Sequence, residues 1–367
     1  MENEKQFDFF DACVQDIIKY SPSEQSDLFF FSGNMPDFSF FEQAVNILKE
    51  NILVVLPFRT VIPDSILKSK QNDFTMLELN PFSEDSDFAL KQSSKNVLCF
   101  ADVRLFSEDR FWRFAEYINF GRIFVLFADC ANLYEYGYRQ SFSLIGEYRA
   151  SQKQYIHLTA FFNQMYEDAE DFTARFYSQK LISVNTLPQN LPAEFVEKVN
   201  QREKYIFLAS SLKNEPVEKT AVVFATRREL FEFVSHLKKP LNELSIAHGG
   251  MSLADFGNSL NDFYDGKTKI LLATKAVFAS SVFINCDKVY YCSLPFSVAN
   301  LYSVHSLFEN RNNKVTCIYC NEDAVLLSRL ALGSAEHFGI EEKDEFIKNR
   351  LTGLNEIIKN IRKEKVK

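Results

Sequence analysis

The chain has 367 residues, 46% of them hydrophobic and 25% charged, which predicts a packed globular protein of about two domains. Its net charge of −8 counts against a protein that holds duplex DNA through a broad basic surface. Glycine is scarce, at 11 residues, and phosphate-binding loops need glycine because the backbone must approach the phosphate closely, so the composition also counts against a nucleotide-dependent enzyme.

The N-terminal sequence, MENEKQFDFFDACVQ, is acidic and lacks the pattern of a signal peptide. The apolar stretches of the chain are far too short to span a bilayer. The seven cysteines are scattered and lie mostly in apolar runs, as buried reduced thiols do in a cytosolic protein. We therefore expect a cytoplasmic protein without a membrane segment.

Short apolar runs alternate with amphipathic helical segments along the chain. The first series of predicted strands comprises Ile52–Leu56, Phe74–Leu79, Val97–Phe100, Ile123–Phe127 and Ile156–Thr159. The second series comprises Ala221–Phe224, Leu244–Ala247, Lys269–Leu272, Lys288–Tyr291 and Val315–Tyr319. This alternation predicts the α/β class, with two parallel sheets that helices cover on both faces.

A segment of turn-forming and strand-breaking residues, NTLPQNLP (Asn185 to Pro192), separates the two series. We expect an N-terminal domain over residues 1–190, a second domain over 191–335 and a helical tail over 336–367. Apolar residues of the tail recur at alternating spacings of four and three, at Ile347, Leu351, Leu354, Ile358 and Ile361. This stripe predicts a helix that packs on its own protein or, alternatively, a seam for a dimer or partner protein.

Four pieces of the second half follow one another in a distinctive order: VVFATRRELFEFVSHL, AHGGMSL, FYDGKTKILLATKAVF and VYYCSLPFSVANLY. In this order and at nearly these spacings they resemble the RecQ family of superfamily-two DNA helicases. In the first half, VLCFADVRLFSEDRF is similar to that family's strand with the APERL segment, and IHLTAFF is similar to its LTATA motif. The segment Ile123 to Arg149 is similar to the strand with the DEAH box and the aromatic-rich loop behind it. The resemblance spans roughly residues 40–332 and implies two tandem RecA-like domains of the P-loop NTPase type.

The phosphate-binding loop departs from the family pattern. After the strand ILVVLP the family has P-T-G-x-G-K-S, whereas this chain has Phe58 to Pro63, which includes Arg59. Both glycines are absent, and Ile62 takes the position of the lysine that neutralises phosphate charge. Isoleucine carries no charge, and Pro63 has no N–H to donate, so the resemblance implies a degenerate nucleotide site.

The carboxylate pair of the DEAH box is also broken. The box aligns with Ala128 to Ala131, so that Ala128 takes the place of the magnesium-binding acid and Asp129 alone remains. A shift of one position would restore the metal-site Asp but would leave the general base absent. In either register, the pair that would hold the metal and activate water is incomplete.

The arginine finger is missing as well. The family motif aligns with Ser303 to Asn310, in which both arginine positions are lost, and Arg311 lies one residue late, as a displaced remnant or an exposed loop residue. The G-M-G-I-D segment aligns with Phe278 to Val282 and has lost its acid. We therefore expect no ATP hydrolysis and no cofactor. The alternative is a residual ATPase that uses Arg59, Asp129 and Arg311 in altered roles.

A pair of cysteines, Cys317 and Cys320, has the CxxC spacing of zinc ligands. However, the pair lies in a predicted strand, where residues three apart face opposite sides, and the sequence contains no second CxxC. The family's four-cysteine zinc subdomain is also missing, since the tail resembles only the first arm of its helical hairpin. We therefore expect buried thiols and no metal site.

Candidate nucleic-acid ligands remain in both halves. The loop NLYEYGYRQ carries Tyr134, Tyr136, Tyr138 and Arg139, and the resemblance implies that this loop touches single-stranded DNA, although the rings could instead pack within the protein. The resemblance further implies contacts of strand tips with the nucleic-acid backbone, which would involve Arg104, Thr226, Arg227 and His248. The alternative for these tips is a solvated loop or an interdomain contact.

These observations favour a catalytically inactive RecQ-like helicase homologue. We expect it to bind single-stranded or branched nucleic acid weakly, or to serve as a subunit of a DNA-processing complex in repair or recombination. The alternative is a protein-interaction scaffold with no nucleic-acid role, which the acidic charge and the C-terminal helix stripe favour.

Overall fold

The computed structural model divides into two compact units, residues 1–187 (unit 1) and 188–367 (unit 2). It describes residues 27–31, 35–57, 60–70, 74–81, 83–84, 95–131, 136–163, 176, 181–185, 191–214, 218–237, 244–308, 312–337 and 343–366. The division falls inside the segment Asn185 to Pro192 that separates the two series of predicted strands.

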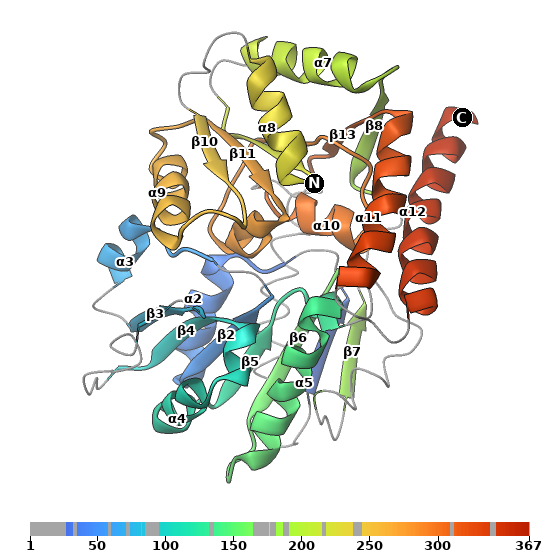
Figure 1. Ribbon diagram of the computed structural model, residues 1–367. Helices are drawn as coiled ribbons and strands as arrows, with labels where there is room; N and C mark the ends of the chain where they lie inside the picture. Colours follow the sequence, from blue (N-terminus) through green and yellow to red (C-terminus); the bar gives the residue numbers. More distant parts are fainter. Residues whose placement is uncertain are drawn as a thin grey trace. The chain divides into compact units, whose positions relative to one another are not determined.

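Unit 1 is a parallel sheet flanked by helices (Figure 1). Its strands are β1 (Asp27–Phe31), β2 (Ile52–Leu56), β3 (Thr75–Leu79), β4 (Val97–Asp102), β5 (Arg122–Val125), β6 (His157–Phe162) and β7 (Leu181–Asn185). Its helices are α2 (Phe38–Leu48), α3 (Asp64–Lys70), α4 (Asp109–Ile118) and α5 (Tyr136–Ser151), with short 3₁₀ helices η2 (Val103–Ser107) and η3 (Ala128–Ala131). The strand order is β3-β4-β2-β5-β6-β1-β7, and the described pairings are parallel.

Phenylalanine makes much of the core of unit 1. The carboxylate of Asp37 caps the start of α2 by accepting a hydrogen bond from the N–H of Phe40 (3.2 Å). This orients Phe40 and Phe41 toward the sheet, where their rings meet other rings edge to face at centroid distances of 5.5 to 5.8 Å. The partners on β4, β5 and β6 are Phe100, Phe124 and Phe161. Burial of each ring contributes roughly 1.5–3 kcal/mol, which explains why so many phenylalanines suit this fold.

A buried ion pair fixes β1 within unit 1. The carboxylate of Asp27, which is fully buried on β1, accepts hydrogen bonds from Nη2 of Arg149 (2.8 Å), the hydroxyl of Tyr155 (2.9 Å) and the N–H of Leu158 (2.9 Å). Arg149 lies on α5 and also donates to the carbonyl of Ile156 from Nε (3.0 Å). The pair therefore joins β1, the end of α5 and the start of β6.

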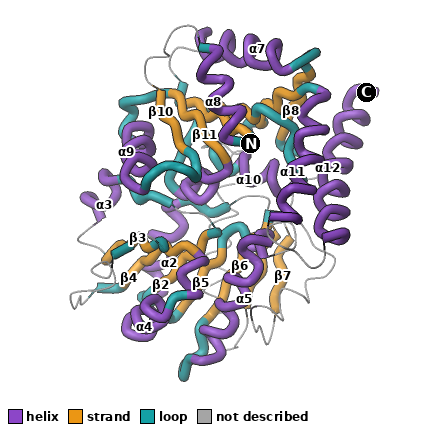
Figure 2. The backbone as a smooth tube through the Cα atoms, viewed as in Figure 1, coloured by secondary structure: helices purple, strands orange, loops and turns teal. Residues whose placement is uncertain are grey.

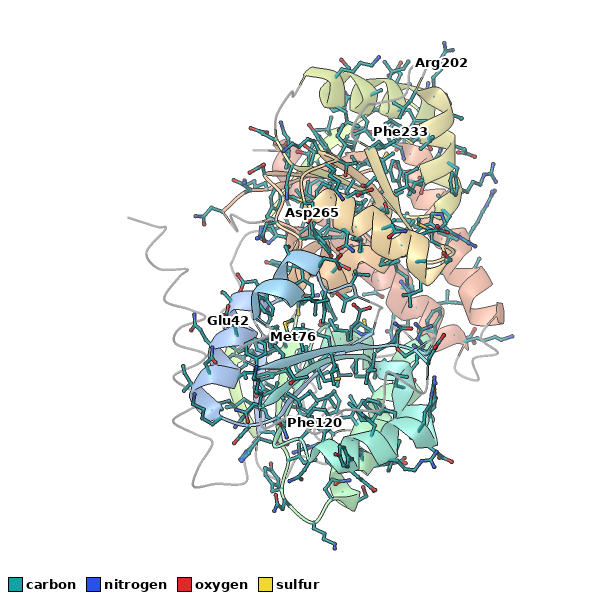
Figure 3. The ribbon with its side chains drawn as sticks, turned by 90° about the vertical axis from the view of Figure 1, so that its left-hand side faces the viewer. Glu42, Met76, Phe120, Arg202, Phe233 and Asp265 are labelled. Atoms are coloured by element: carbon teal, nitrogen blue, oxygen red, sulfur yellow. The ribbon has the colours of Figure 1, made fainter. Side chains whose placement is uncertain are left out.

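Unit 2 is a second parallel sheet with helices on its faces (Figure 2). Its strands are β8 (Ala193–Glu197), β9 (Thr220–Phe224), β10 (Leu244–Ala247), β11 (Ile270–Thr274), β12 (Lys288–Tyr291) and β13 (Val315–Tyr319). Its helices are α7 (Gln201–Asn214), α8 (Arg227–His236), α9 (Leu253–Tyr264), α10 (Val298–His305), α11 (Asn321–His337) and α12 (Lys343–Val366), with the 3₁₀ helix η5 (Lys275–Val282). The strand order is β10-β11-β9-β12-β13-β8, with parallel pairings. Figure 3 shows Phe233 of α8 among the side chains of unit 2, whereas the exposed Arg202 of α7 projects away from them.

The helical tail is part of unit 2 rather than a separate body, because α12 packs beside α11 (Figure 1). Of the predicted stripe, Leu354 and Ile361 are buried, whereas Ile347, Leu351 and Ile358 are only partly buried. Phe346 and Ile357 complete the buried face. The face contributes to a cluster with Leu294, Tyr319 and Leu327 of the same unit. The stripe therefore packs on its own domain, and the partner seam predicted as the alternative is covered at these positions.

Replacing two glycines with alanine, one at the close approach of α12 and one on the open surface of α11, should change the stability of the fold in opposite directions. A Cβ on Gly353 would lie 2.9 Å from the carbonyl oxygen of Phe296, so Gly353→Ala should destabilise the fold by about 1–3 kcal/mol. Among the described residues, a Cβ on Gly333 of α11 would meet nothing within 4 Å, so Gly333→Ala should stabilise it by about 0.5–1 kcal/mol. Urea denaturation followed by circular dichroism measures both changes, and the same sign for the two variants would contradict this packing.

Among the described residues, no helix combines the length and apolar character that crossing a membrane requires.

Candidate nucleic-acid interface and nucleotide site

Three strand ends of unit 2 lie together at one edge of the sheet. Strand β11 pairs in parallel with β9 on one side and with β10 on the other, and Ala273 is level with Ala247 and Val223. The carboxyl ends of these strands therefore share an edge. The segments that follow them carry three predicted ligands, Thr226, Arg227 and His248, and an exposed Lys275 that the sequence analysis did not single out.

Thr226 begins α8 as its N-cap. Its side-chain oxygen accepts a hydrogen bond from the N–H of Glu229 (3.1 Å), and its hydroxyl lies 3.3 Å from Oε2 of the same glutamate. This capping arrangement occupies the Thr226 side chain and places Arg227 on the exposed first turn of the helix. Thr226 is therefore a positioning residue for Arg227.

Arg227 and His248 meet at a glycine turn. The N–H of Gly250 donates to Nδ1 of His248 (3.1 Å), and the N–H of Met251 donates to the His248 carbonyl (3.1 Å). A Cβ on Gly250 would overlap the guanidinium of Arg227, which therefore lies directly against this turn. Gly249 approaches Ala276, at the start of η5. The segments that follow β9, β10 and β11, which are far apart in the sequence, thus form one continuous surface.

Arg104 lies at the carboxyl end of β4 in unit 1. Its backbone N–H and its Nε each donate to Oδ1 of the buried Asp102 (2.9 Å), and its Nη2 donates to the other carboxylate oxygen. The Arg104 side chain remains 42% exposed. The carboxylate holds the guanidinium in a fixed orientation and offsets its charge.

Several predicted residues cannot be placed. Tyr134, Arg59 and Arg311 lie outside the described residues. Tyr136, Tyr138 and Arg139 belong to the first turns of α5, but their side chains lie outside the description.

In the segment that the resemblance aligns with the phosphate loop, a carboxylate of the protein accepts a hydrogen bond from the backbone. The N–H of Ile62 donates to Oε2 of Glu78 on β3 (2.8 Å), and the Ile62 side chain is buried. Burial raises the pKa of Glu78 to about 7, although the hydrogen bond from Ile62 opposes the rise. The N–H at the position of the family's phosphate-binding lysine is thus directed at an acid of the protein itself.

The raised pKa of Glu78 predicts a pH-dependent stability. Between the ordinary value of 4.5 and about 7, folded Glu78 keeps a proton that the unfolded chain has lost, so its contribution to stability falls as pH rises through this window. Glu78→Gln should therefore gain stability relative to the unaltered protein from pH 5 to pH 7. Urea midpoints at pH 5, 6, 7 and 8 measure this difference, and a difference that stays constant with pH would exclude the assignment.

Asp129, which the resemblance aligns with the DEAH box, also has a structural partner. Asp129 is buried in η3, and its Oδ2 accepts a hydrogen bond from the N–H of Asn163 (2.7 Å), just after β6. Ala128 is fully buried beside it. Asp129 therefore joins the ends of β5 and β6.

Other described positions that the resemblance aligns with motor motifs are buried. Leu307, which aligns with an arginine of the finger motif, is fully buried, and its carbonyl accepts a hydrogen bond from the N–H of Cys286 (2.9 Å). In η5, Phe278 and Ser281 are buried as well. An arginine finger requires an exposed cation, which these side chains cannot supply.

The CxxC pair consists of buried thiols. Burial raises the pKa of both, that of Cys320 to about 12, and the Cys320 thiol lies 3.0 Å from the carboxylate of Glu322. Within the part of the chain that the structure describes, no group of three or more His, Cys, Asp or Glu side chains could hold a metal ion.

A buried charge cluster in unit 2 was not predicted. Nζ of the fully buried Lys204 lies 2.7 Å from Oδ1 of Asp323, 3.5 Å from Oε1 of Glu229 and 3.2 Å from the carbonyl of Cys292. Burial alone would lower the pKa of Lys204, but the acidic groups around the lysine outweigh this effect, and the net result is a raised pKa. Burial raises the pKa of Glu229. The sequence signal was Lys204 itself, which shares the buried face of α7 with Leu208 and Leu212.

An open cavity of about 390 Å³ lies over this cluster. It is lined by Gln201, Thr226, Arg228, Glu229, Glu232, Glu322, Asp323, Val325, Leu326 and Arg329. Its lining thus comes from α7, α11, and α8 with its N-cap, and carries more acidic than basic side chains.

Comparison with known proteins identifies the fold. Residues 197–326 match the helicase conserved C-terminal domain, whereas no curated protein matches the sequence. The S. cerevisiae helicase-fold protein Dbp5 bound to RNA and ADP BeF3 superposes with a TM-score of 0.63 at 13% identity, over 96% of this chain and 93% of that chain. The Mycobacterium smegmatis helicase Lhr bound to ssDNA and AMP-PNP gives 0.64 at 12% identity, over 90% of this chain and 48% of that one. The helicase MrfA bound to DNA gives 0.59 at 9% identity, over 90% and 50%.

Identities this low establish the fold alone. The α/β prediction with two tandem RecA-like domains is confirmed. The chain therefore has a tandem RecA-like fold similar to that of superfamily-two helicases, and its residues 197–326 match the helicase conserved C-terminal domain.

Proposed function

We propose that this protein is a catalytically inactive, RecQ-like helicase homologue that binds single-stranded or branched nucleic acid, on its own or as a subunit of a cytoplasmic DNA-processing complex. The observation that carries the proposal is the contrast between two sites. The strand tips of unit 2 keep Arg227 and His248 on a continuous surface, whereas Glu78 and Asp129 near the nucleotide site each accept a hydrogen bond from a backbone N–H of the protein itself.

Nucleic-acid binding is supported by the cations at the carboxyl edge of unit 2. Arg227, Arg228 and Lys275 are exposed, and Arg228 is held by Glu232 at 2.7 Å. Cations and backbone N–H groups at helix starts are the usual partners of phosphate oxygens. The structures of Dbp5, Lhr and MrfA named above were solved with RNA, ssDNA and DNA respectively.

Loss of ATP hydrolysis is supported by the surroundings of three motor positions within the described part of the chain. Glu78 binds the N–H of Ile62, Asp129 binds the N–H of Asn163, and Leu307 is buried where a finger arginine is needed. Phosphoryl transfer needs a phosphate cradle, a metal carboxylate and a cation together. The side chains that remain would have to give up structural contacts to supply any of them.

The test is fluorescence anisotropy of labelled single-stranded DNA across a salt series, with Arg227→Ala as the variant. Lys267→Ala is the matched control, because Lys267 is an exposed cation that precedes β11, at the opposite edge of the same sheet. We expect saturable binding that weakens with salt, a salt slope smaller by about one for Arg227→Ala, and no change for Lys267→Ala.

No binding at low salt would overturn the nucleic-acid part of the proposal. Magnesium-dependent phosphate release that Asp129→Ala abolishes would overturn the inactive part and favour the residual ATPase.

The second candidate is a protein-interaction scaffold without a nucleic-acid role. The cavity over Lys204 favours it, since its lining carries four acidic side chains, Glu229, Glu232, Glu322 and Asp323, against two basic ones, Arg228 and Arg329. Absence of nucleic-acid binding together with retention of a basic peptide would support this second function.

A further inference from the structure

One large apolar side chain stands out beside the strand tips of unit 2. Phe231 of α8 is 49% exposed, whereas Phe233 on the same helix is fully buried in the core. An exposed phenylalanine by itself is ordinary on a protein surface. Its neighbours make this one informative.

The ring of Phe231 contacts the ring of His248. Their centroids are 5.3 Å apart and the planes meet at 73°, an edge-to-face arrangement. His248 is held in turn by the N–H of Gly250, whose turn lies against the guanidinium of Arg227. The turn that follows β10 therefore fixes the orientation of the His248 ring, and with it the aromatic contact with Phe231.

Phe231 and Arg227 also share one side of α8, because residues four apart lie one turn above each other on a helix. The cation stands at the start of the helix and the aromatic ring follows one turn later. An exposed cation beside an exposed ring is the combination that proteins use to hold the backbone and the bases of a single strand.

We infer that the Phe231–His248 pair is a base-stacking platform, and that the ligand of this surface is a nucleic acid with unpaired bases. The inference rests on the proposed nucleic-acid binding of unit 2. Arg227 binds a phosphate of the strand, and the base next to this phosphate stacks on the ring of Phe231, which shields the base from water. A duplex cannot use the ring, since its bases are already stacked inside the helix. The contact to a π face is independent of base identity.

The test compares the unaltered protein with Phe231→Ala and Phe231→Leu on three labelled probes: an oligothymidine, the same strand with a central run of abasic sites, and a blunt hairpin duplex. Phe231→Leu keeps an apolar side chain of similar size but no π face. Tyr117→Ala is the control, because Tyr117 is an aromatic residue of α4 in unit 1 that is 60% exposed.

We expect both Phe231 variants to bind oligothymidine roughly 5- to 150-fold more weakly, which corresponds to about 1–3 kcal/mol for a stacked base. The salt slope should stay unchanged, because the phosphate contacts remain. Binding of the hairpin should not change. The unaltered protein should bind the abasic strand more weakly than it binds oligothymidine. The Phe231 variants should bind these two strands with equal affinity.

The outcomes separate this inference from the function on which it rests. If the unaltered protein binds none of the probes, the proposed function fails and the inference fails with it. If it binds oligothymidine and both Phe231 variants bind equally tightly, the inference alone is overturned. Equal losses on the oligothymidine and the hairpin would overturn it too, since they would show that Phe231 supports the fold of α8 and not the contact with bases.

Discussion

Replacing Lys204 with methionine should lower the free energy of unfolding of unit 2 by about 3–5 kcal/mol. Methionine fills a similar volume, but it leaves the carboxylates of Asp323 and Glu229 together in the protein interior without their cation. Two buried carboxylates repel each other once the lysine between them is gone, and each loses its charged partner. The expected loss is a large share of the 5–15 kcal/mol that stabilises a typical domain.

Lys213→Met is the matched control for this prediction, because Lys213 lies on the same helix and is exposed. The single tryptophan, Trp112, separates the two units in the measurement, since it belongs to α4 of unit 1. Lys204→Met should shift the unfolding transition seen by circular dichroism and leave the transition of Trp112 fluorescence in place. A shift of less than 1 kcal/mol would contradict the role of the cluster.

Replacing Arg149 with methionine should destabilise unit 1 by a similar amount, about 3–5 kcal/mol. Asp27 would lose both contacts with Nη2 and would remain fully buried, and the carbonyls of Ile156 and Phe176 would lose their donors. An uncompensated buried charge and unpaired carbonyls each cost free energy. The strand β1, which Asp27 begins, should lose its attachment to β6 first.

Trp112 reports this change directly. Its ring contacts Tyr148 edge to face at 5.8 Å, and Tyr148 precedes Arg149 on α5. Arg149→Met should therefore move the urea midpoint of Trp112 fluorescence to lower urea. Arg113→Met, which changes an exposed arginine of α4 in the same unit, should leave the midpoint in place. An equal midpoint for both variants would exclude the proposed role of the ion pair.

The strands of the fold were largely predictable because most are continuous apolar runs buried on both faces. Each of the predicted strands overlaps a strand of the structure, and β2 was predicted with its observed ends. The three missed strands are β1, β7 and β8. Two of them, β7 and β8, lie at sheet edges. In β8, the sequence AEFVE is exposed at both glutamates, so its pattern is weaker than that of a central strand.

Residues of the candidate site were predictable only where the order of sequence motifs along the chain identified them. Arg227 and His248 were identified from the tips of successive segments, and the structure brings them together. The partners of the charged side chains were not predictable. Lys204, Glu229 and Asp323 lie on three different helices, and each has the composition of an ordinary surface charge until the chain has folded. The role of Glu78 could not be predicted either, because its partner is a backbone N–H, which the sequence does not mark.

The contact between Glu78 and Ile62 bears on what would be needed to build a phosphate site into this segment by design. Restoring a lysine at position 62 would not restore phosphate binding, because the carboxylate that already holds the loop would attract the new cation. Removing Glu78 alone would leave the buried N–H without its acceptor. A designed variant that binds phosphate in this segment would therefore need a lysine, glycines and the replacement of Glu78 together, because each change alone leaves one of these obstacles in place.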